Sequence, residues 1–156
     1  VPEFGLMLTL PAEYRNVAYY GMGPGETYSD FTSGAHMGLF GFDAHTALQP
    51  YFNPQESGAR TGVQAAAVTD AAGFGLCLAG NGFMLSALPY TPHEVENARR
   101  QYELPPKVKT VVRCAKGQLG VAGDNTWGAG PHAEYHVALE KGETFRFTFG
   151  GMGGNG

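Results

Sequence analysis

The chain has 156 residues and a mass of 16.6 kDa, which suits one domain better than two. Its 10 Lys and Arg residues against 14 Asp and Glu residues give a net charge of −4 at pH 7. This balance argues against a nucleic-acid or anionic-membrane partner, because either calls for a basic face. No run reaches the roughly 18 apolar residues of a membrane span, and we expect no signal peptide at the N-terminus. The 24 Gly and 10 Pro residues divide the chain into short segments, which favours strands and turns over helix bundles.

Taken in chain order, the first predicted element is a strand over residues 4–10, where apolar residues recur with period two. Its expected buried face consists of Phe4, Leu6, Leu8 and Leu10. Residues 63–69 and 74–78 are weaker strand candidates with the same kind of pattern. The first half of the chain therefore indicates β-structure.

A single segment breaks this pattern and predicts a helix. Thr91 suits the N-cap position, Pro92 the first helical position, and Glu94 the position three residues after the cap. Val95, Ala98 and Tyr102 follow at helical spacing, so we expect a helix of about 10 residues that ends before Pro105-Pro106. Such a helix would cover an edge or an end of a sheet.

The segments after the helix return to period two. The faces expected to be buried are Val108, Thr110, Val112 and Cys114; Tyr135, Val137 and Leu139; and Phe145, Phe147 and Phe149. The opposite face of the first of these segments carries Lys107, Lys109, Val111 and Arg113. Residues 140–143 contain a glycine and predict a hairpin turn between the last two strands. Together the segments predict an antiparallel all-β fold with one short helix.

The domain boundary is expected near the C-terminus of the sequence. Residues 1–149 form the predicted β domain, and residues 150–156, almost all glycine, form a predicted flexible tail. Cys77 and Cys114 lie in apolar segments, which predicts small buried hydrophobic side chains. Sequence alone leaves a disulfide between them open, because it does not show the geometry that a disulfide requires.

Histidines and carboxylates provide the first candidates for chemistry. His132 and His136 are four residues apart, a zinc-binding spacing on a helix, but the strand pattern around Tyr135 argues against that helix, so we predict no metal site. Four carboxylates stand beside turn residues, where acidic side chains often cap backbone groups: Glu26, Asp30, Glu56 and Asp124. We therefore favour a structural role for them over catalysis.

The strongest candidate is Trp127, the only tryptophan, which lies in a loop of turn-forming residues. An indole in such a loop presents a flat apolar face to a sugar ring while its N–H finds a polar partner. A lid over one end of the core is an equally good interpretation of the same residue.

The residues around Trp127 resemble the end-domain signature of β-galactosidases of glycoside hydrolase family 2. In this chain the signature is Asp124-Asn125-Thr126-Trp127-Gly128, preceded by Gly120-Val121-Ala122-Gly123. Further blocks of that domain occur in the same order, at residues 20–30 (YGMGPGETYSD), 50–60 (PYFNPQESGAR), 86–91 (SALPYT) and 103–105 (ELP). Several long blocks in one order are far more specific than any lone motif, and they cover residues 1 to about 149.

The resemblance implies a large antiparallel β-sandwich, a supersandwich similar to the galactose mutarotase fold. In such enzymes this domain is the last of five or the bulk of a separate small subunit. The catalytic acid/base and nucleophilic glutamates lie in a central barrel, which this chain lacks. The resemblance therefore implies no catalytic residue here and one substrate-binding loop, in which Trp127 contacts the sugar and Asp124 and Asn125 shape the loop.

The resemblance also implies partners and cofactors. The expected partners are the remaining domains or a large subunit, together with a galactoside such as lactose. No cofactor is expected in this chain, since Mg and Na in a parent enzyme would be bound by its other domains. The cytoplasm is favoured over the periplasm as the compartment, while substrate preference and oligomeric state stay open.

Two other functional hypotheses compete with a β-galactosidase domain that is inert alone. A free-standing carbohydrate-binding module would use Trp127 and the Gly-rich loops directly. A mutarotase-like enzyme would use a histidine and a carboxylate as base and acid, with His36, His45, Asp43 and Glu56 as candidates.

Overall fold

The computed structural model describes residues 1–125, 127–138 and 140–153. Seven strands in these residues form one antiparallel sheet, so the all-β antiparallel class predicted from the sequence is confirmed. The strands are β1 (Glu3–Pro11), β2 (Asn16–Gly23), β3 (His36–Asp43), β4 (Arg60–Thr69), β5 (Gly75–Leu88), β6 (Lys109–Gln118) and β7 (Phe147–Met152). The helices are α1 (Pro92–Asn97) and the short 3-10 helices η1 (Ala44–Thr46), η2 (Gln101–Glu103) and η3 (Ala133–Tyr135).

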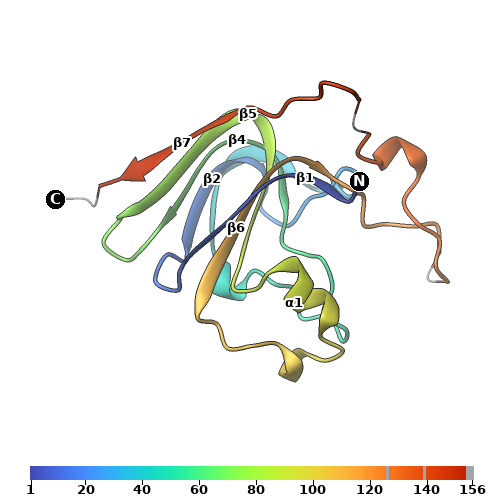
Figure 1. Cartoon of the computed structure of the whole chain (residues 1–156), viewed down its shortest axis with the longest axis horizontal. Coiled ribbons are helices and arrows are strands. Elements are labelled where there is room, and N and C mark those ends of the chain that lie inside the picture. Colours follow the sequence, from blue (N-terminus) through green and yellow to red (C-terminus); the bar gives the residue numbers. More distant parts are fainter. Residues whose placement is uncertain (126, 139, 154–156) are drawn as a thin grey trace.

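The long strand β5 organises the sheet, whose strand order is β1-β6-β5-β4-β2-β3 with β7 added on β5. Residues 75–80 of β5 pair with β7, and residues 84–88 pair with β6. Between these halves the register with β4 shifts, and Gly82 has a positive φ of 74°, which glycine adopts at low cost. The sheet bends here, and β1 and β6 cross in front of β2 and β4 (Figure 1). The fold thus has two β layers, as in a sandwich.

The core lies between these two layers, because alternate residues of each strand face it. On β2, Val17 and Tyr19 are buried while Ala18 and Tyr20 face outward. The same cluster takes residues from four strands and η1: Val17, Tyr19, Ala44, Val63, Ala66, Val68, Leu78, Phe83, Leu85, Ala87, Val112 and Cys114. Burial of these side chains supplies the hydrophobic stabilisation of the fold.

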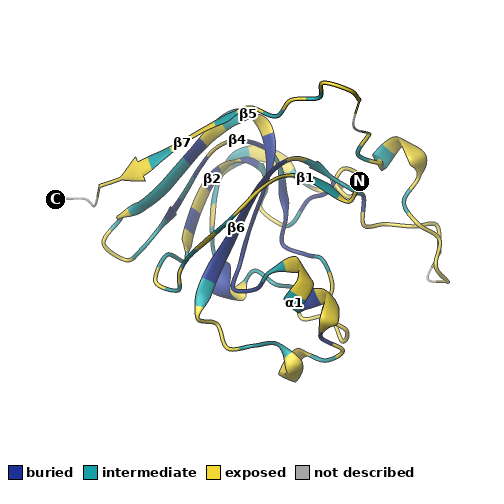
Figure 2. Cartoon of the chain, in the orientation of Figure 1, coloured by how far each residue is buried: buried dark blue, intermediate teal, exposed yellow. Residues whose placement is uncertain are grey.

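Strand β6 is buried on both faces, unlike the one-sided strand that the sequence predicts (Figure 2). The segment of residues 44–60 and α1 pack beside its second face, where Lys107 and Lys109 make contacts to His45 and Glu94. Arg113 was expected on an open face and is 4% exposed, because this second layer covers it. Val108, expected to be buried, is exposed and precedes the strand.

The helix begins as predicted but is shorter. Thr91 and Glu94 form the expected capping box, in which Glu94 N donates to Thr91 Oγ1 at 3.2 Å and Thr91 N donates to Glu94 Oε2 at 2.7 Å. The helix spans 6 residues and ends where Ala98 adopts extended backbone. Tyr102, expected on its buried stripe, is therefore 83% exposed.

The hairpin predicted over residues 135–149 does not form. Tyr135 belongs to η3, residues 136–138 and 140–146 are outside strands, and Leu139 lies outside the described residues. The turn at residues 140–143 is present, with Glu143 N donating to Glu140 O at 3.1 Å and Gly142 at a φ of 87°. The strand after it, β7, pairs with β5 instead of with a local partner, because that edge of β5 is free beyond β6.

The predicted flexible tail begins inside this last strand. Residues 150–152 pair with Gly75, Leu76 and Cys77, so the strand continues past the boundary expected at residue 149. The backbone N–H and C=O groups of glycine form the hydrogen bonds of a strand without any contribution from a side chain, so a high glycine content does not by itself predict a flexible tail. Residues 154–156 of the predicted tail lie outside the described residues.

Both cysteines are free. Cys114 is a buried core residue as predicted, and burial raises the pKa of its thiol to about 12. Cys77 is half-buried, and its Sγ donates to the Gly150 carbonyl at 3.3 Å. Within the described ranges, no helix is long and apolar enough to span a membrane.

The outward side of β2, β4 and β5 is apolar and exposed, and we call it the outer face. Ala18, Ala65, Ala67 and Ala79 form its floor, with Tyr20, Leu39 and Phe149 around them. The floor lines a depression of about 470 Å³, and Leu39 beside it is 78% exposed. A sheet that carries apolar residues on both faces is typical of a layer buried between other layers.

Candidate functional site

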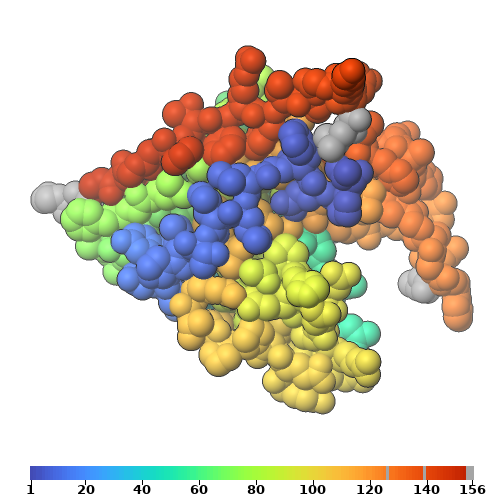
Figure 3. Space-filling view, in the orientation of Figure 1, coloured from blue at the N-terminus to red at the C-terminus, as the bar shows by residue number. Residues whose placement is uncertain are grey.

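Trp127 lies in a long connection between β6 and β7, residues 119–146, which we call the arm. The arm lies to one side of the sheet in Figure 1 and projects from the body of the molecule in Figure 3. Trp127 is 92% exposed, and Asp124 and Asn125 beside it are exposed as well. The indole therefore does not act as a lid over the core, which was one of the two interpretations of this residue.

Hydrogen bonds inside the loop hold the backbone of Trp127. Asn125 Oδ1 accepts a hydrogen bond from Trp127 N at 2.8 Å and a longer one from Ala129 N at 3.5 Å, an Asx-type turn. A Cβ at Gly123 would overlap the carbonyl oxygen of Ala129, so the two sides of the loop approach as closely as only glycine allows. These hydrogen bonds of Asn125 hold the backbone of the loop in a turn.

Asp124 binds a histidine of the same arm. Asp124 Oδ1 and His132 Nε2 are 2.8 Å apart, and this hydrogen bond, together with the carboxylate charge, raises the pKa of His132. His136, the other residue of the predicted pair, contacts the Pro131 carbonyl through Nε2 at 3.1 Å. The two histidines therefore have separate partners and do not converge.

The base of the loop is bound by the carboxylate of Asp30, which is far from the loop in the sequence. Val121 N donates to Asp30 Oδ1 at 3.1 Å, and Ala122 N donates to Asp30 Oδ2 at 2.7 Å. A Cβ at Gly120 would overlap Asp30 Oδ2, so glycine is needed for this approach. The sequence blocks at residues 20–30 and 120–128 are therefore in direct contact.

A buried ion-pair network lies beside this contact. Arg113 donates through Nη1 to Glu3 Oε2 at 2.7 Å and through Nη2 to Glu56 Oε1 at 2.6 Å. Tyr28 donates its hydroxyl to the same Glu56 oxygen at 3.0 Å. The network connects the N-terminal strand, the two blocks at residues 20–30 and 50–60, and β6.

Electrostatics in this network follow from burial and charge. Burial opposes the charge of Arg113, but Glu56 and Glu3 outweigh burial, and the pKa of the guanidinium lies above its ordinary value. Burial raises the pKa of Glu3 against the opposing effect of Arg113, and burial followed by the charge of Glu56 raises the pKa of Tyr28. Tyr28 therefore stays a neutral donor.

Two of the four carboxylates beside turns cap backbone groups, as the sequence predicts, and the other two bind side chains. Glu26 accepts from Gly58 N at 2.7 Å, and Asp30 caps Val121 and Ala122. Asp124 and Glu56 instead bind His132 and Arg113. Sequence reasoning missed Arg113, although an arginine inside the apolar run Val111-Val112-Arg113-Cys114-Ala115 signals a buried partner.

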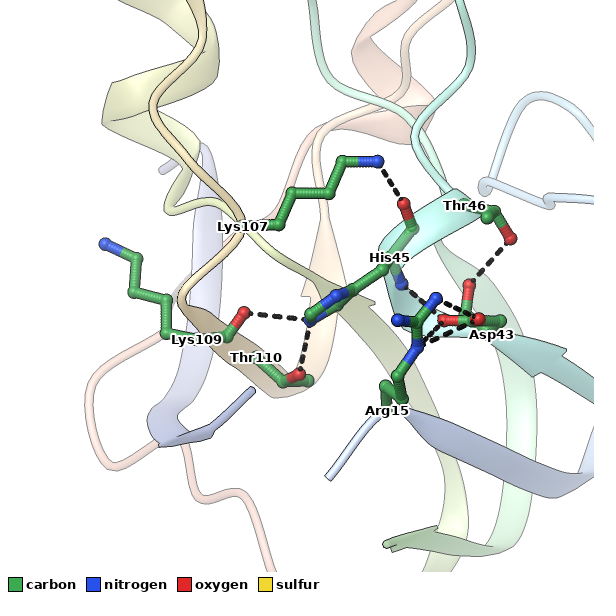
Figure 4. A network of polar contacts seen from close by, with 7 residues as sticks. All are labelled: Arg15, Asp43, His45, Thr46, Lys107, Lys109 and Thr110. Carbon is green, nitrogen blue, oxygen red and sulfur yellow. Dashed lines mark hydrogen bonds and ion pairs between the residues drawn. The ribbon is translucent and has the colours of Figure 1, made fainter. Parts of the chain in front are cut away.

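His45 and Asp43, two candidates of the mutarotase hypothesis, lie close together but are held by other groups (Figure 4). Asp43 binds the Arg15 guanidinium and accepts from the backbone N of His45 at 2.8 Å. The His45 ring turns toward β6, where Nε2 is 3.2 Å from both the Lys109 carbonyl and Thr110 Oγ1. Burial, then the charge of Arg15, lowers the pKa of His45.

The other two candidates of that hypothesis are elsewhere. His36 packs edge-on against the Phe40 ring at 5.3 Å between centroids, and Glu56 is bound by Arg113. The four side chains do not converge on one site. In residues 1–125, 127–138 and 140–153, no three His, Cys, Asp or Glu side chains form a group with metal-binding geometry.

Comparison with known proteins gives one family. A protein-family model described as "Beta galactosidase small chain" matches residues 1–150. A β-galactosidase of Halalkalibacterium halodurans is 40% identical over 151 residues, which are 96% of this chain and 15% of that protein. A β-galactosidase of Streptococcus thermophilus is 36% identical over 150 residues, 95% of this chain and 14% of that protein.

A shorter relative is the β-galactosidase small subunit of Latilactobacillus sakei. It is 28% identical over 159 residues, which cover 94% of this chain and 49% of that subunit. The chain thus spans about half of this small subunit, and about 15% of the Halalkalibacterium enzyme.

Replacing Arg113 should destabilise the fold strongly. Arg113→Met leaves Glu3 and Glu56 without their cation, and we expect a loss of about 2 to 3 kcal/mol in the free energy of unfolding. This is less than for a fully buried pair, because both carboxylates are partly exposed. Urea denaturation measures the loss, with Arg99→Met, at an exposed position, as the control. Equal stability of the two variants would contradict the role of Arg113.

His45 should make the fold less stable in mild acid. Its pKa is lower in the folded chain than in the unfolded chain, so the unfolded state takes up the proton first as the pH falls from 7 to 5.5. This uptake lowers the free energy of unfolding, while His132 and Glu3, whose pKa values are raised, act in the opposite sense in every variant, so the change toward lower stability should be larger in the unmodified chain than in His45→Gln. His93→Gln, at an exposed position of α1, should keep the change of the unmodified chain. Denaturant midpoints at both pH values test this, and an equal change in all three proteins would contradict it.

Proposed function

The chain belongs to the β-galactosidase small-chain family, and we propose that the protein containing it hydrolyses terminal β-galactosides such as lactose. The match of the family model over residues 1–150 is the observation that carries this proposal. In this proposal the chain contributes the Trp127 loop to the sugar-binding pocket and contributes no catalytic carboxylate.

The contacts of the carboxylates support a non-catalytic role. A glycosidase needs two carboxyl groups that face each other across the scissile bond, roughly 5 to 9.5 Å apart and free to act. Of the acidic residues near the loop, Glu26 is bound to Gly58 N and Asp30 to Val121 and Ala122. Glu56 is bound to Arg113. The reacting groups would therefore come from the rest of the protein.

The exposure of Trp127 supports its role in sugar binding. Asn125 holds the backbone of the loop, yet the Trp127 side chain is 92% exposed. An indole face stacks on the C–H groups of a galactose ring, and its N–H finds a hydroxyl or a protein acceptor. A fixed backbone with a free indole suits a side chain that completes a pocket built by another domain.

The outer face supports a second contact with the rest of the protein, and we assign it to the remaining half of the small chain. The small subunit of Latilactobacillus sakei is about twice as long as its match to this chain, so a family member contains further polypeptide of similar size. Alanines in the floor leave room for the larger side chains of a covering layer. Such a layer would bury Leu39 and Phe149, which are exposed here.

Trp127→Ala should weaken substrate binding in the assembled enzyme. The chain and the remaining residues of its parent protein are produced separately and mixed, and hydrolysis of a chromogenic β-galactoside is followed. We expect no activity from the chain alone, activity in the mixture, and a KM at least about tenfold higher with Trp127→Ala. Tyr102→Ala, which removes an exposed aromatic side chain outside the arm, is the control.

Two results would count against this function. Unchanged kinetics in Trp127→Ala would remove the loop from the pocket, and activity of the chain alone would mean that it contains a catalytic pair. If galactose instead quenched the fluorescence of Trp127 in the chain alone, the free-standing carbohydrate-binding module would be favoured.

Leu39→Asp should weaken association through the outer face. A carboxylate placed under a covering apolar layer loses its hydration without gaining a partner, so we expect at least about tenfold weaker complementation. The concentration of chain that gives half-maximal activity in the mixture measures this. Tyr102→Asp introduces the same charge at another exposed apolar residue and should leave it unchanged. Equal effects of the two variants would show that the outer face is not the contact.

A further inference from the structure

Among the described residues, Asp30 is the side chain that links the Trp127 loop, residues 121–130, to a part of the chain outside the arm. Just before the loop, Leu119 N donates to the Pro2 carbonyl at 2.7 Å. Residues 121–130 contain no strand or helix. Asn125 and Asp124 make hydrogen bonds only within the arm, to Trp127, Ala129 and His132. Among the described residues, the hydrogen bonds from residues 121–130 to any group outside the arm all end on Asp30.

The geometry of this contact is that of a strong anchor. Two successive backbone N–H groups, of Val121 and Ala122, each point at one oxygen of the Asp30 carboxylate, at 3.1 and 2.7 Å. Hydrogen bonds to an ionised acceptor are stronger than neutral ones, and a paired arrangement fixes direction as well as distance. The carboxylate therefore sets both the position and the orientation of the loop base.

Asp30 is itself fixed to the core. It lies in a tight turn in which Tyr28 N donates to the Phe31 carbonyl, and Phe31 N to the Tyr28 carbonyl, each at 3.0 Å. Tyr28 is 2% exposed, and its hydroxyl is bound by Glu56 of the Arg113 network. Asp30 is thus connected to the buried Arg113 through its turn, Tyr28 and Glu56, and it contacts the loop at the other side.

From these contacts we propose that Asp30 is a positioning residue for sugar binding: its carboxylate holds residues 121–122 and thereby sets where the Trp127 indole stands in the pocket. This rests on the proposed role of Trp127 in the sugar-binding pocket. Asp30 does not touch the sugar and acts through the loop. A displacement of the loop base is carried along the backbone to the indole, because the internal bonds of Asn125 keep the loop itself in shape.

Asp30→Asn tests the anchor with the least change in size. The variant keeps one acceptor oxygen but presents an amide N–H₂ to one of the two backbone N–H groups. Gly120→Ala is the second variant, since its Cβ would push the unmodified carboxylate away from the loop. Asp70→Asn is the matched control, because Asp70 also accepts from two backbone N–H groups, of Ala72 and Phe74 at 2.9 Å each, in the turn between β4 and β5.

The first measurement reports the anchor without reference to activity. Hydrogen exchange followed by mass spectrometry, on the mixture of the chain with the rest of the protein, gives the protection of the amides of residues 121–122. We expect exchange there to be about tenfold faster in Asp30→Asn and in Gly120→Ala, as for the loss of a charged hydrogen bond. Asp70→Asn should leave it unchanged.

The second measurement reports the function. In the same mixture we expect Asp30→Asn to raise KM about tenfold while kcat changes little, because the loop contributes binding and no chemistry. In a Trp127→Ala background the same substitution should have no further effect, since both act through one indole. Asp70→Asn should have the KM of the unmodified chain.

The outcomes separate the two proposals. If Trp127→Ala raises KM while Asp30→Asn behaves as Asp70→Asn does, the positioning role is overturned and the proposed function stands. Effects of Asp30→Asn that add fully to those of Trp127→Ala would also overturn it, because Asp30 would then act by another route. If Trp127→Ala leaves the kinetics unchanged, the proposed role of Trp127 in the pocket fails, and the role of Asp30 in sugar binding fails with it, whatever the exchange rates show.

Discussion

The buried guanidinium of Arg113 is the interaction on which the arrangement of the site depends. It lies on β6, between β1 and β5, and binds carboxylates from the N-terminal strand and from the block at residues 50–60. Glu56, held by Arg113, accepts a hydrogen bond from the Tyr28 hydroxyl. Tyr28 begins the turn that contains Asp30, and Asp30 contacts the base of the loop. A charge in the core is costly unless it is fully paired, so this network tolerates few alternative arrangements and gives the exposed loop a defined base.

Much of the sheet is readable from local pattern, and the rest depends on distant partners. The alternation of Phe4 to Leu10 and the capping box at Thr91 are local signals, and both elements form, although Leu6 of the predicted buried face is exposed and the rest of that face is only half-buried. Strands β2 and β3 contain four glycines, which weaken the period-two pattern in their sequences, and these strands are specified by their pairing with each other and with β4. The final strand pairs with β5, about 70 residues earlier in the sequence, so no turn signal could indicate its partner.

The candidate site divides in the same way. Trp127 and Asn125 stand out in the sequence because turn residues surround the only tryptophan, and the Asx-type turn follows from Asn125 itself. The contact of Asp30 with Val121 joins residues 91 positions apart, and the sequence shows only that acids and glycines occur at both places. Arg113 was assigned to an open face because period two is a rule for strands with one covered face, and β6 has two.

Arg113 and Asp30 hold different parts of the molecule. Arg113 is buried and ties three parts of the chain together, so its loss acts on folding. Asp30 is only half-buried and its two hydrogen bonds reach no strand, so we expect its loss to change where the loop lies while the sheet keeps its contacts. In the proposed function the domain supplies one side chain to a pocket in another domain, and this role would need such a separation, because the indole would have to be free to contact the sugar while its backbone stays fixed. The hydrophobic core cannot provide that placement, since any side chain packed into it is no longer available for binding. Hydrogen bonds to a charged group at the surface can provide it, because they hold the backbone and leave the side chain free.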